Sequence, residues 1–340
     1  MNNNKPEMLE REFIEKRTVT VEADGSVGKQ WFKTRIKDKE AYQEFREAVN
    51  SFAEDSNLYS KKIIRKRKKT KKELLSVYAI GDAHVGLLSW KNETGEDTGL
   101  DSMVEDLTGA MTLLVDKADN TGTALIVDVG DWFHSDNQSN RTSHSGNALD
   151  VDGRYGKVLK AGMQLAVTLI DLALEKHDKI IWRSAIGNHN EHSAIMMMAF
   201  LEAWYRNEPR VKIETSENMF FYMKWGKNLI GITHGHTVKA EKLGEIMAVD
   251  MERYWSESEH RWWYTGHIHH QSVKEFPSCT VETFNTMIGK DAWHSASGYR
   301  SRQQMTCITL DKEFGEEDRA IVSLKKVRSG KKETLQHSGS

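Results

Sequence analysis

Five short blocks of one kind constrain the fold of this chain more than any other feature. In each block an apolar run ends at a small residue and is followed by Asp, Asn or His. An apolar run bounded in this way predicts a buried strand, and α/β sheets bind ligands at the carboxyl ends of their strands. The sequence therefore predicts a site built from five strand ends. The blocks are Gly81-Asp82-Ala83-His84, Gly130-Asp131-Trp132-Phe133-His134, Gly187-Asn188-His189, His234-Gly235-His236 and Gly266-His267-Ile268-His269.

Hydrophobic periodicity places these blocks in an α/β fold. Strands and helices alternate in the first part of the main domain and strands dominate later, an order typical of two sheets packed face to face with helices outside. The long polar stretch 135–153 is expected to be a lid or a substrate wall. Helices are predicted over residues 101–118, 155–176 and 196–205, and strands over residues 74–80, 124–129, 179–182, 229–233, 261–265, 280–283 and 305–310.

The chain divides into four segments of different composition. Residues 1–60 are expected to form a small appendage, with a hairpin that ends near residue 32 and a helix over residues 38–52. A basic linker over residues 61–73 follows. The main domain is expected over residues 74–325, and residues 326–340 are expected to be a frayed polar tail.

Composition bounds the class of protein. The chain has 340 residues, of which 38% are hydrophobic, enough for a core. It has no apolar run of membrane-spanning length, and its first residues lack the apolar segment of a signal peptide. Two cysteines are too few for a disulfide framework, so we expect a protein of a reducing, cytoplasmic compartment. The sequence carries no signal for oligomeric state.

Charge is distributed unevenly along the chain. Residues 1–76 contain 19 Lys and Arg against 13 Asp and Glu, a net of +6, and the remainder has a net of −8. Nine of the twelve residues from 61 to 72 are basic. Such a run is either a solvated linker or a contact for the phosphate backbone of nucleic acid. It ends about ten residues before Asp82, so it is expected to reach a polyanion entering the site.

The residue types in the five blocks are those that bind divalent metals. Asp, Asn and His together suit Mn, Fe, Zn, Ni or Co, whereas a cage of carboxylates and carbonyls suits Mg or Ca. A single His-x-His pair is a weak signal, because histidines at strand ends are commonly hydrogen-bonded surface residues. Together the blocks supply seven candidate ligands. Seven residues make four bonds to each of two ions when one carboxylate bridges, and we expect Asp131 to be that bridge.

The order of the blocks resembles the pattern of the calcineurin-like metallophosphoesterases, D-x-H, G-D, G-N-H-[DE], H and G-H-x-H. The match covers residues 81–269. The resemblance implies a four-layer αββα sandwich and two divalent ions, with Mn expected first and Fe, Zn, Ni or Co as alternatives. It implies that one ion is held by Asp82, His84, Asp131 and His269, and the other by Asp131, Asn188, His234 and His267.

The resemblance also implies catalytic residues. His189 is expected to contact the phosphate or protonate the leaving oxygen, and His134 to orient a phosphodiester, beside Asn188. Residues 130–134 are similar to the G-D-x-F-H of DNA repair exonucleases of the double-strand-break type, and they lack the D-R-G of protein Ser/Thr phosphatases. The arrangement is also similar to phosphoesterases common in bacteriophage genomes. Asn190 stands where the family usually has an acidic residue, which changes the charge beside the ligands.

The expected activity is hydrolysis of phosphodiester bonds by an exonuclease-like enzyme that acts on DNA or RNA. The expected partner is a nucleic acid or nucleotide substrate and not a membrane. A small- or cyclic-nucleotide phosphodiesterase and a phosphomonoesterase are alternatives, and a non-catalytic scaffold is the remote one, because no ligand is missing. Of the other histidines, the sequence assigns His236 to orienting a ligand, His144, His192 and His294 to the pocket, and His177 and His260 to the surface.

Overall fold

The computed structural model describes residues 14–21, 27–34, 69–142, 145–289 and 301–337. The chain separates into two compact units, Met1–Tyr59 and Ser60–Ser340. In the first unit, β1 (Ile14–Val21) and β2 (Val27–Thr34) pair as an antiparallel hairpin, as the sequence predicts. The helix predicted over residues 38–52 lies outside the described residues.

The first sheet of the larger unit has six strands in the order β13-β12-β3-β4-β5-β6. The strands β3 to β6 are mutually parallel, and β12 and β13 extend the sheet in antiparallel fashion. Ile80 lies opposite Asp128, and Asp128 lies opposite Ser184, so the three central strands end at the same level. Their bounds are β3 (Lys71–Ile80), β4 (Thr121–Asp128), β5 (Lys179–Ser184), β6 (Val211–Glu214), β12 (Gln304–Asp311) and β13 (Gly315–Ser323).

The second sheet has five strands in the order β10-β11-β9-β8-β7. The central strands β8, β9 and β11 are parallel, and β7 and β10 are antiparallel edges. Ile232 lies opposite Tyr264, so β8 and β9 also end close to one level. The bounds are β7 (Phe221–Trp225), β8 (Asn228–Ile232), β9 (His260–Thr265), β10 (Ser272–Glu275) and β11 (Thr280–Thr283).

The two sheets pack face to face around one apolar core. Alternate residues of β3, Leu75, Val77 and Ala79, point into it, because successive side chains of a strand leave on opposite faces. The facing sheet contributes Ile230 and Tyr264 to the same cluster. Each of these five side chains is at most 1% exposed, so burial of apolar surface holds the sheets together.

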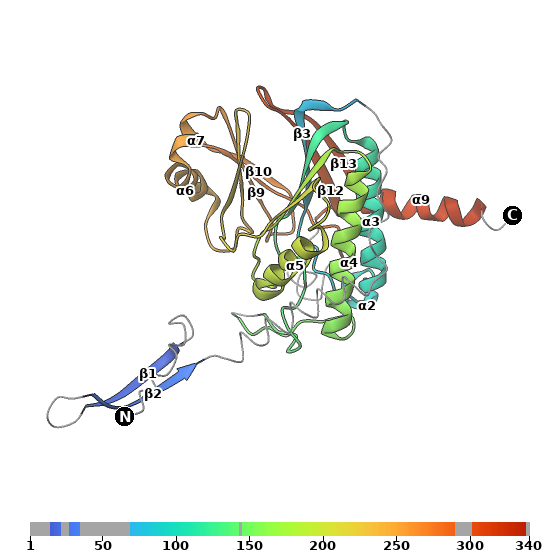
Figure 1. The fold of residues 1–340 in the computed structure, drawn as a ribbon. Helices are drawn as coiled ribbons and strands as arrows, with labels where there is room; N and C mark the ends of the chain where they lie inside the picture. The colour runs from blue at the N-terminus through green and yellow to red at the C-terminus, as the bar shows by residue number, and fades with distance from the viewer. Residues whose placement is uncertain (1–13, 22–26, 35–68, 143–144, 290–300, 338–340) are drawn as a thin grey trace. The chain divides into compact units, whose positions relative to one another are not determined.

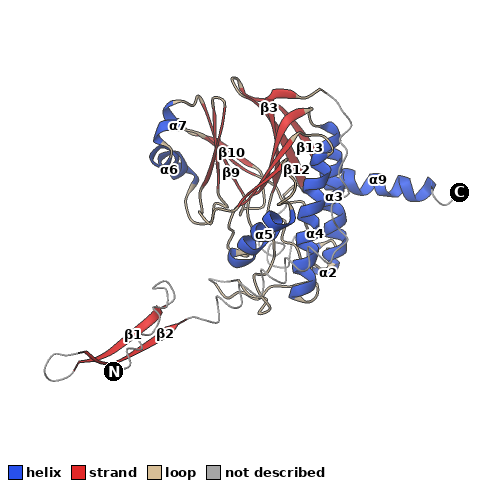
Figure 2. Cartoon of the chain, in the orientation of Figure 1, coloured by secondary structure: helices blue, strands red, loops and turns tan. Residues whose placement is uncertain are grey.

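Helices cover the outer faces of both sheets (Figures 1 and 2). The first sheet is covered by α3 (Leu100–Lys117), α4 (Tyr155–Leu174) and α5 (Glu191–Trp204). On the second sheet, Leu243 and Met247 of α6 (Leu243–Asp250) pack against Trp263 of β9. The predicted four-layer αββα sandwich is therefore confirmed. The short elements are α2 (Lys91–Thr94), η2 (Ala240–Lys242) and α7 (Glu252–Ser256).

Three expectations about local structure differ from what is observed. The strand β3 already begins at Lys71, inside the predicted linker. Residues of the predicted frayed tail form α9 (Leu324–His337), because buried Val327 and the ion pair of Arg328 with Asp106, at 2.8 Å, attach it to α3. His177, expected at the surface, is fully buried, and its Nε2 lies 2.8 Å from the hydroxyl of Tyr78.

Among the described residues, the helices are too short or too polar to cross a bilayer.

Candidate metal centre

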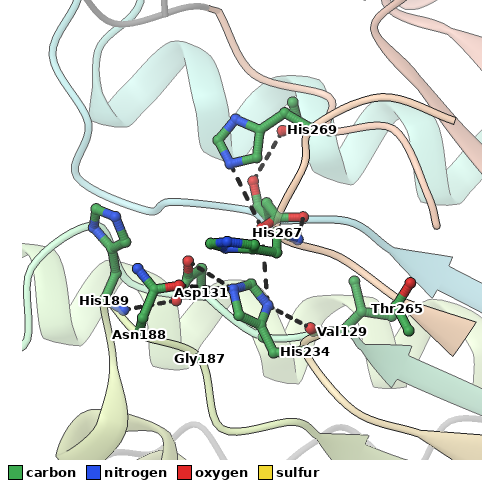
Figure 3. A network of polar contacts seen from close by, with 12 residues as sticks. Val129, Asp131, Gly187, Asn188, His189, His234, Thr265, His267 and His269 are labelled. Carbon is green, nitrogen blue, oxygen red and sulfur yellow. Dashed lines mark hydrogen bonds and ion pairs between the residues drawn. The ribbon is translucent and has the colours of Figure 1, made fainter. Parts of the chain in front are cut away.

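The five predicted blocks follow the carboxyl ends of five parallel strands. Blocks from the first sheet follow β3, β4 and β5, and blocks from the second follow β8 and β9. Since the sheets face each other and their strands end at matched levels, the loops beyond those ends lie together (Figure 3). Figure 3 shows Asp131, Asn188 and His189 of the first sheet beside His234, His267 and His269 of the second.

The backbone is strained where the blocks carry their ligands. The residues with positive φ are otherwise glycines, apart from Asn140, within the described part of the chain. A non-glycine residue in this region costs of order 1–3 kcal/mol and persists only where its surroundings fix it. Five candidate ligands have it, which concentrates the strain at one site: Asp82 (φ 32°), His84 (41°), Asp131 (55°), His267 (74°) and His269 (55°).

The first group of candidate ligands consists of Asp82, His84 and His269. The Nε2 atoms of the two histidines lie 3.0 Å apart, and the Nε2 of His269 lies 3.5 Å from the Oδ1 of Asp82. Asp82 and His84 are at most 1% exposed. One potential ligand atom from each residue lies within 4.8 Å of the others, a spacing that a single ion can span.

The second group consists of Asp131, His234 and His267, again with ligand atoms within 4.8 Å of one another. The Nε2 of His234 lies 3.0 Å from the Oδ2 of Asp131 and 3.1 Å from the amide oxygen of Asn188. The Oδ1 of Asp82, in the first group, lies 3.9 Å from the Nδ1 of His234, in the second, so the two groups are neighbours. Six of the seven predicted ligands thus fall into two groups, and Asn188 contacts the second through His234, while their role as metal ligands and the bridging role of Asp131 stay predictions.

Backbone groups orient the ligands of both groups. The carbonyl of Val129 accepts a hydrogen bond from the Nδ1 of His234 at 2.9 Å, which turns Nε2 toward Asp131. The carboxylate of Asp82 accepts from the backbone N–H of His267, at 2.9 and 3.1 Å. The Oδ1 of Asp131 accepts from the N–H of His189 at 2.8 Å. The first two contacts join the two sheets, and the third joins the loops that follow β4 and β5 of the first sheet.

Glycines leave the space that this arrangement needs. A Cβ on Gly187 would lie 2.0 Å from the Oδ1 of Asp131, and one on Gly266 would lie 2.6 Å from the Oδ2 of Asp82. A Cβ on Gly130 would meet the ring of His234 at 2.6 Å, and this residue also has φ 103°, which favours glycine. The small residue that precedes a ligand is thus a packing requirement of the centre.

The charges of the centre fit a divalent cation. Burial alone would raise the pKa of Asp131, but the imidazole of His234 and the N–H of His189 hold it well below its usual range. Burial alone would lower the pKa of His234, but Asp131 and Asp82 raise it to about 9. Because both ring nitrogens of His234 face oxygen acceptors, its Nε2 carries a proton without a metal. A bound cation would take the place of that proton.

A third group brings together the predicted catalytic histidines. The rings of His134 and His189 stack with centroids 5.4 Å apart, and the ring of His189 lies 4.8 Å from that of His84. The Nδ1 of His134 lies 3.1 Å from the Nδ1 of His84. Ligand atoms of these three residues also lie within 4.8 Å of one another. Because His84 belongs to the first group of ligands as well, the predicted catalytic histidines lie next to that group.

Buried aromatic residues fix the block that contains Asp131 and His134. Trp132 and Phe133 are fully buried against α4, where the absence of a side chain on Gly162 gives the ring of Phe133 its space. The indole of Trp132 donates to the carbonyl of Gly162 at 3.3 Å. The intervening aromatic pair therefore faces the helices, while Asp131 and His134 face the centre.

Two residues have roles that the sequence did not predict. Asn190, noted only for its missing charge, is fully buried, and its Oδ1 accepts from the N–H of Asp131 at 3.2 Å and of Gly187 at 3.1 Å. Thr286 donates its hydroxyl to the carbonyl of Asp82 at 2.9 Å. The only signal in the sequence was an Asn directly after the G-N-H block. The contacts of Asn190 and Thr286 could not be predicted from the sequence, because both depend on the tertiary fold.

The remaining histidines occupy different surroundings. The ring of His236 lies 5.2 Å from that of His234, beside the second group of ligands. His270 is exposed, and its Nδ1 lies 2.8 Å from the carbonyl of Ile268. His260 is half-buried against the carbonyl of Glu313. The pocket predictions for His144 and His294 lie outside the described residues.

Comparisons with known proteins find solved structures that resemble this chain only distantly. No family model matches the chain, and no curated protein matches it. A dimetal phosphatase from Danio rerio aligns with a TM-score of 0.41 and 6% identity over 74% of this chain and 99% of its own. An archaeal phosphodiesterase gives 0.37 and 14% over 73% and 99%. A putative 5'-nucleotidase from Staphylococcus aureus gives 0.38 and 13% over 74% and 54%. At such values the ligand assignment depends on the motif and on the geometry above.

We predict that the purified protein binds two divalent ions per chain and that Asp131→Asn is the most damaging ligand substitution, because it weakens both sites. Loss of a supporting group typically costs 10–100-fold, so activity should fall on the order of 100-fold or more. Elemental analysis before and after chelation measures the number of metal ions per chain. Metal affinity should also fall as pH is lowered, because protons compete for His234. Full activity in excess chelator would refute the prediction.

We also predict that Gly187→Ala weakens metal binding by about ten-fold or more, because the new Cβ displaces the carboxylate of Asp131. The matched control is Gly156→Ala in the first turn of α4, where a Cβ meets nothing within 4 Å. Titration of the metal-free variants with Mn, followed by calorimetry, compares them. Equal affinities for the two variants would show that the close approach of Gly187 to Asp131 is unimportant.

Proposed function

We propose that this chain is a dinuclear metal-dependent phosphodiesterase that hydrolyses nucleic acid in an exonuclease-like manner. The observation that carries the proposal is the meeting of two Asp/His groups, each able to hold an ion, with the stacked pair His134 and His189. A centre of this kind suits hydrolysis of phosphoric esters. The two ions supply Lewis-acid charge and lower the pKa of a water when they are bound. We propose Mn as the working metal, because the ligands mix carboxylate, amide and imidazole.

The ring of His189, one of the predicted catalytic residues, has a fixed orientation. Its Nδ1 lies 2.9 Å from the carbonyl oxygen of His134. A carbonyl only accepts, so the ring donates Nδ1–H and its Nε2 points away from His134. When the ring carries both protons, Nε2–H is available to a phosphate oxygen or to the departing alkoxide. Imidazole suits this step near neutral pH because its ordinary pKa is about 6.5.

The part proposed for His134 is to hold the arrangement of the histidines. It is 1% exposed, and it contacts His84 through Nδ1 and His189 through its carbonyl. Its ring also stacks on that of His189. His84 belongs to the first group of ligands, and His189 is proposed to protonate the leaving oxygen. His134 therefore links His189 to the first group of ligands. A phosphodiester, which has a second ester group to orient, should depend on this connection most.

Nucleic acid is the proposed substrate on the strength of the G-D-W-F-H block and the basic run. The position of the run differs from the one expected. The described end of the run, Lys69 to Lys72, lies at the beginning of β3 or just before it, whereas Asp82 lies beyond its carboxyl end. A strand rises about 3.3 Å per residue, so roughly 30 Å separates them. Lys69 to Lys72 would therefore contact a long polyanion and not a phosphate at the centre, and residues 61–68 of the run lie outside the described part of the chain.

Two alternatives are distinguished by substrate. A small- or cyclic-nucleotide phosphodiesterase would need no contact so far from the centre, and a phosphomonoesterase would need no diester-orienting His134. A Mn-supplemented panel of single- and double-stranded DNA, RNA, cyclic nucleotides and a small aryl phosphodiester tests all of these. If the protein ignores DNA and RNA but hydrolyses a short or cyclic nucleotide, the nuclease proposal is wrong. Hydrolysis of none of them would favour the scaffold.

We predict that His189→Ala lowers kcat by about 10²–10⁴-fold, the usual contribution of an acid or base, with two ions retained. His134→Ala should impair an aryl phosphodiester more than an activated monoester. His270→Ala is the matched control, because its exposed ring lies next to a candidate ligand but outside the three groups. Kinetics and metal analysis on the same samples decide the roles. Loss of an ion from His189→Ala or His134→Ala would make that residue a ligand instead.

We predict that changing Lys66, Arg67, Lys68 and Lys69 to Gln slows cleavage of long DNA and reduces its salt dependence, because fewer counterions are released. A small aryl phosphodiester, which has no further phosphate to contact the run, should be cleaved as before. The control removes four exposed charges elsewhere, at Lys239, Lys242, Arg253 and Lys274. If both variants behave alike, the run is a linker.

A further inference from the structure

Asp136 is a buried carboxylate just beyond the predicted catalytic residues. It lies two positions after His134, and its side chain is fully buried. It accepts hydrogen bonds from the backbone N–H groups of His192 and Ser193, at 2.9 and 2.7 Å, and from the hydroxyl of Ser193 at 2.7 Å. The Nδ1 of His192 lies 2.7 Å from its Oδ2. The carboxylate thus holds the first turn of α5 and the ring of His192.

Two chain segments, residues 131–136 and 189–193, run side by side outward from the metal centre. Three contacts join them: Asp131 with the N–H of His189, the carbonyl of His134 with the ring of His189, and Asp136 with His192 and Ser193. The side chain of His192 is 72% exposed, whereas that of Asp136 is fully buried. His192 is therefore an exposed side chain that is held by a buried one.

The contact with Asp136 fixes the direction of the His192 ring. An ionised carboxylate only accepts hydrogen bonds, so Nδ1 carries the proton between them. The other ring nitrogen, Nε2, is then directed away from Asp136, on the exposed side of the ring. His192 follows His189 by three residues, so their Cα atoms are at most about 10 Å apart. His192 thus lies within about 10 Å, Cα to Cα, of the residue proposed to act on the scissile phosphate.

We propose that His192, held by Asp136, binds the phosphate of a polynucleotide that neighbours the one being cleaved. This proposal rests on the proposed nuclease function. With both protons present, the ring donates Nδ1–H to Asp136 and offers Nε2–H to a phosphate oxygen, a charge-assisted bond at short range. Restraint by Asp136 lowers the conformational entropy lost on binding. A substrate with a single phosphate cannot use this contact, so His192 would select for a chain of nucleotides.

The test compares two substrates in the Mn-loaded protein, a single-stranded oligonucleotide and a small aryl phosphodiester. His192→Ala should raise the KM of the oligonucleotide about ten-fold, the usual scale for a hydrogen bond to a charged group, with kcat, aryl hydrolysis and metal content unchanged. His192→Lys, which restores a cation, should recover part of the loss. The matched control Ser193→Ala removes one bond to the same carboxylate but no exposed donor, and its KM should stay at the wild-type value.

Each other result contradicts the proposal in a recognisable way. An unchanged KM for the oligonucleotide in His192→Ala refutes the phosphate contact while leaving the nuclease function intact. Equal losses on both substrates place His192 at the scissile phosphate or in the fold, and also refute it. If the wild type hydrolyses the aryl diester but cuts no oligonucleotide, the nuclease function fails together with this inference. Asp136→Asn should act in the same direction as His192→Ala, because an amide cannot accept all four bonds.

Discussion

The pairing of buried carboxylates on one sheet with imidazoles and amides on the other is the interaction on which the centre depends. Asp131 follows β4 of the first sheet and meets the ring of His234, which follows β8 of the second, at 3.0 Å. Asp82 similarly accepts the N–H of His267 across the same gap. Buried charges are stable only when they are paired, so these contacts hold the ligand loops of the two sheets together.

The surrounding structure offsets the backbone strain that this arrangement requires. Five candidate ligands have positive φ, and three glycines stand where a Cβ would collide with a ligand. The apolar core between the sheets and the aromatic anchors behind Asp131 supply stability elsewhere. Strain located at ligands and absent from the strands is typical of preorganised sites. Rigid strand ends thus hold oxygen and nitrogen atoms at spacings that a cation satisfies better than a proton.

The histidines near the centre have different surroundings. His84 is buried with the first group of ligands, His134 and His189 stack beside it, and His192 is exposed and held by Asp136. The Nδ1 atoms of His189 and His192 each face a protein oxygen, which turns the Nε2 of each ring away from that oxygen. These orientations suit the roles proposed above for the two residues.

The sequence by itself determined the layered fold and the seven candidate ligands, because both are encoded locally: an apolar run, a small residue and a ligand recur at five strand ends. Features that depend on contacts between residues far apart in the sequence were decided only by the tertiary structure. The contact of Asp136 with His192 joins residues 56 positions apart, and α9 forms because Arg328 reaches Asp106 in α3. Lys71 and Lys72 of the basic run stand about ten residues before Asp82 in the sequence, yet they lie at the opposite end of the extended β3, because a strand rises about 3.3 Å per residue.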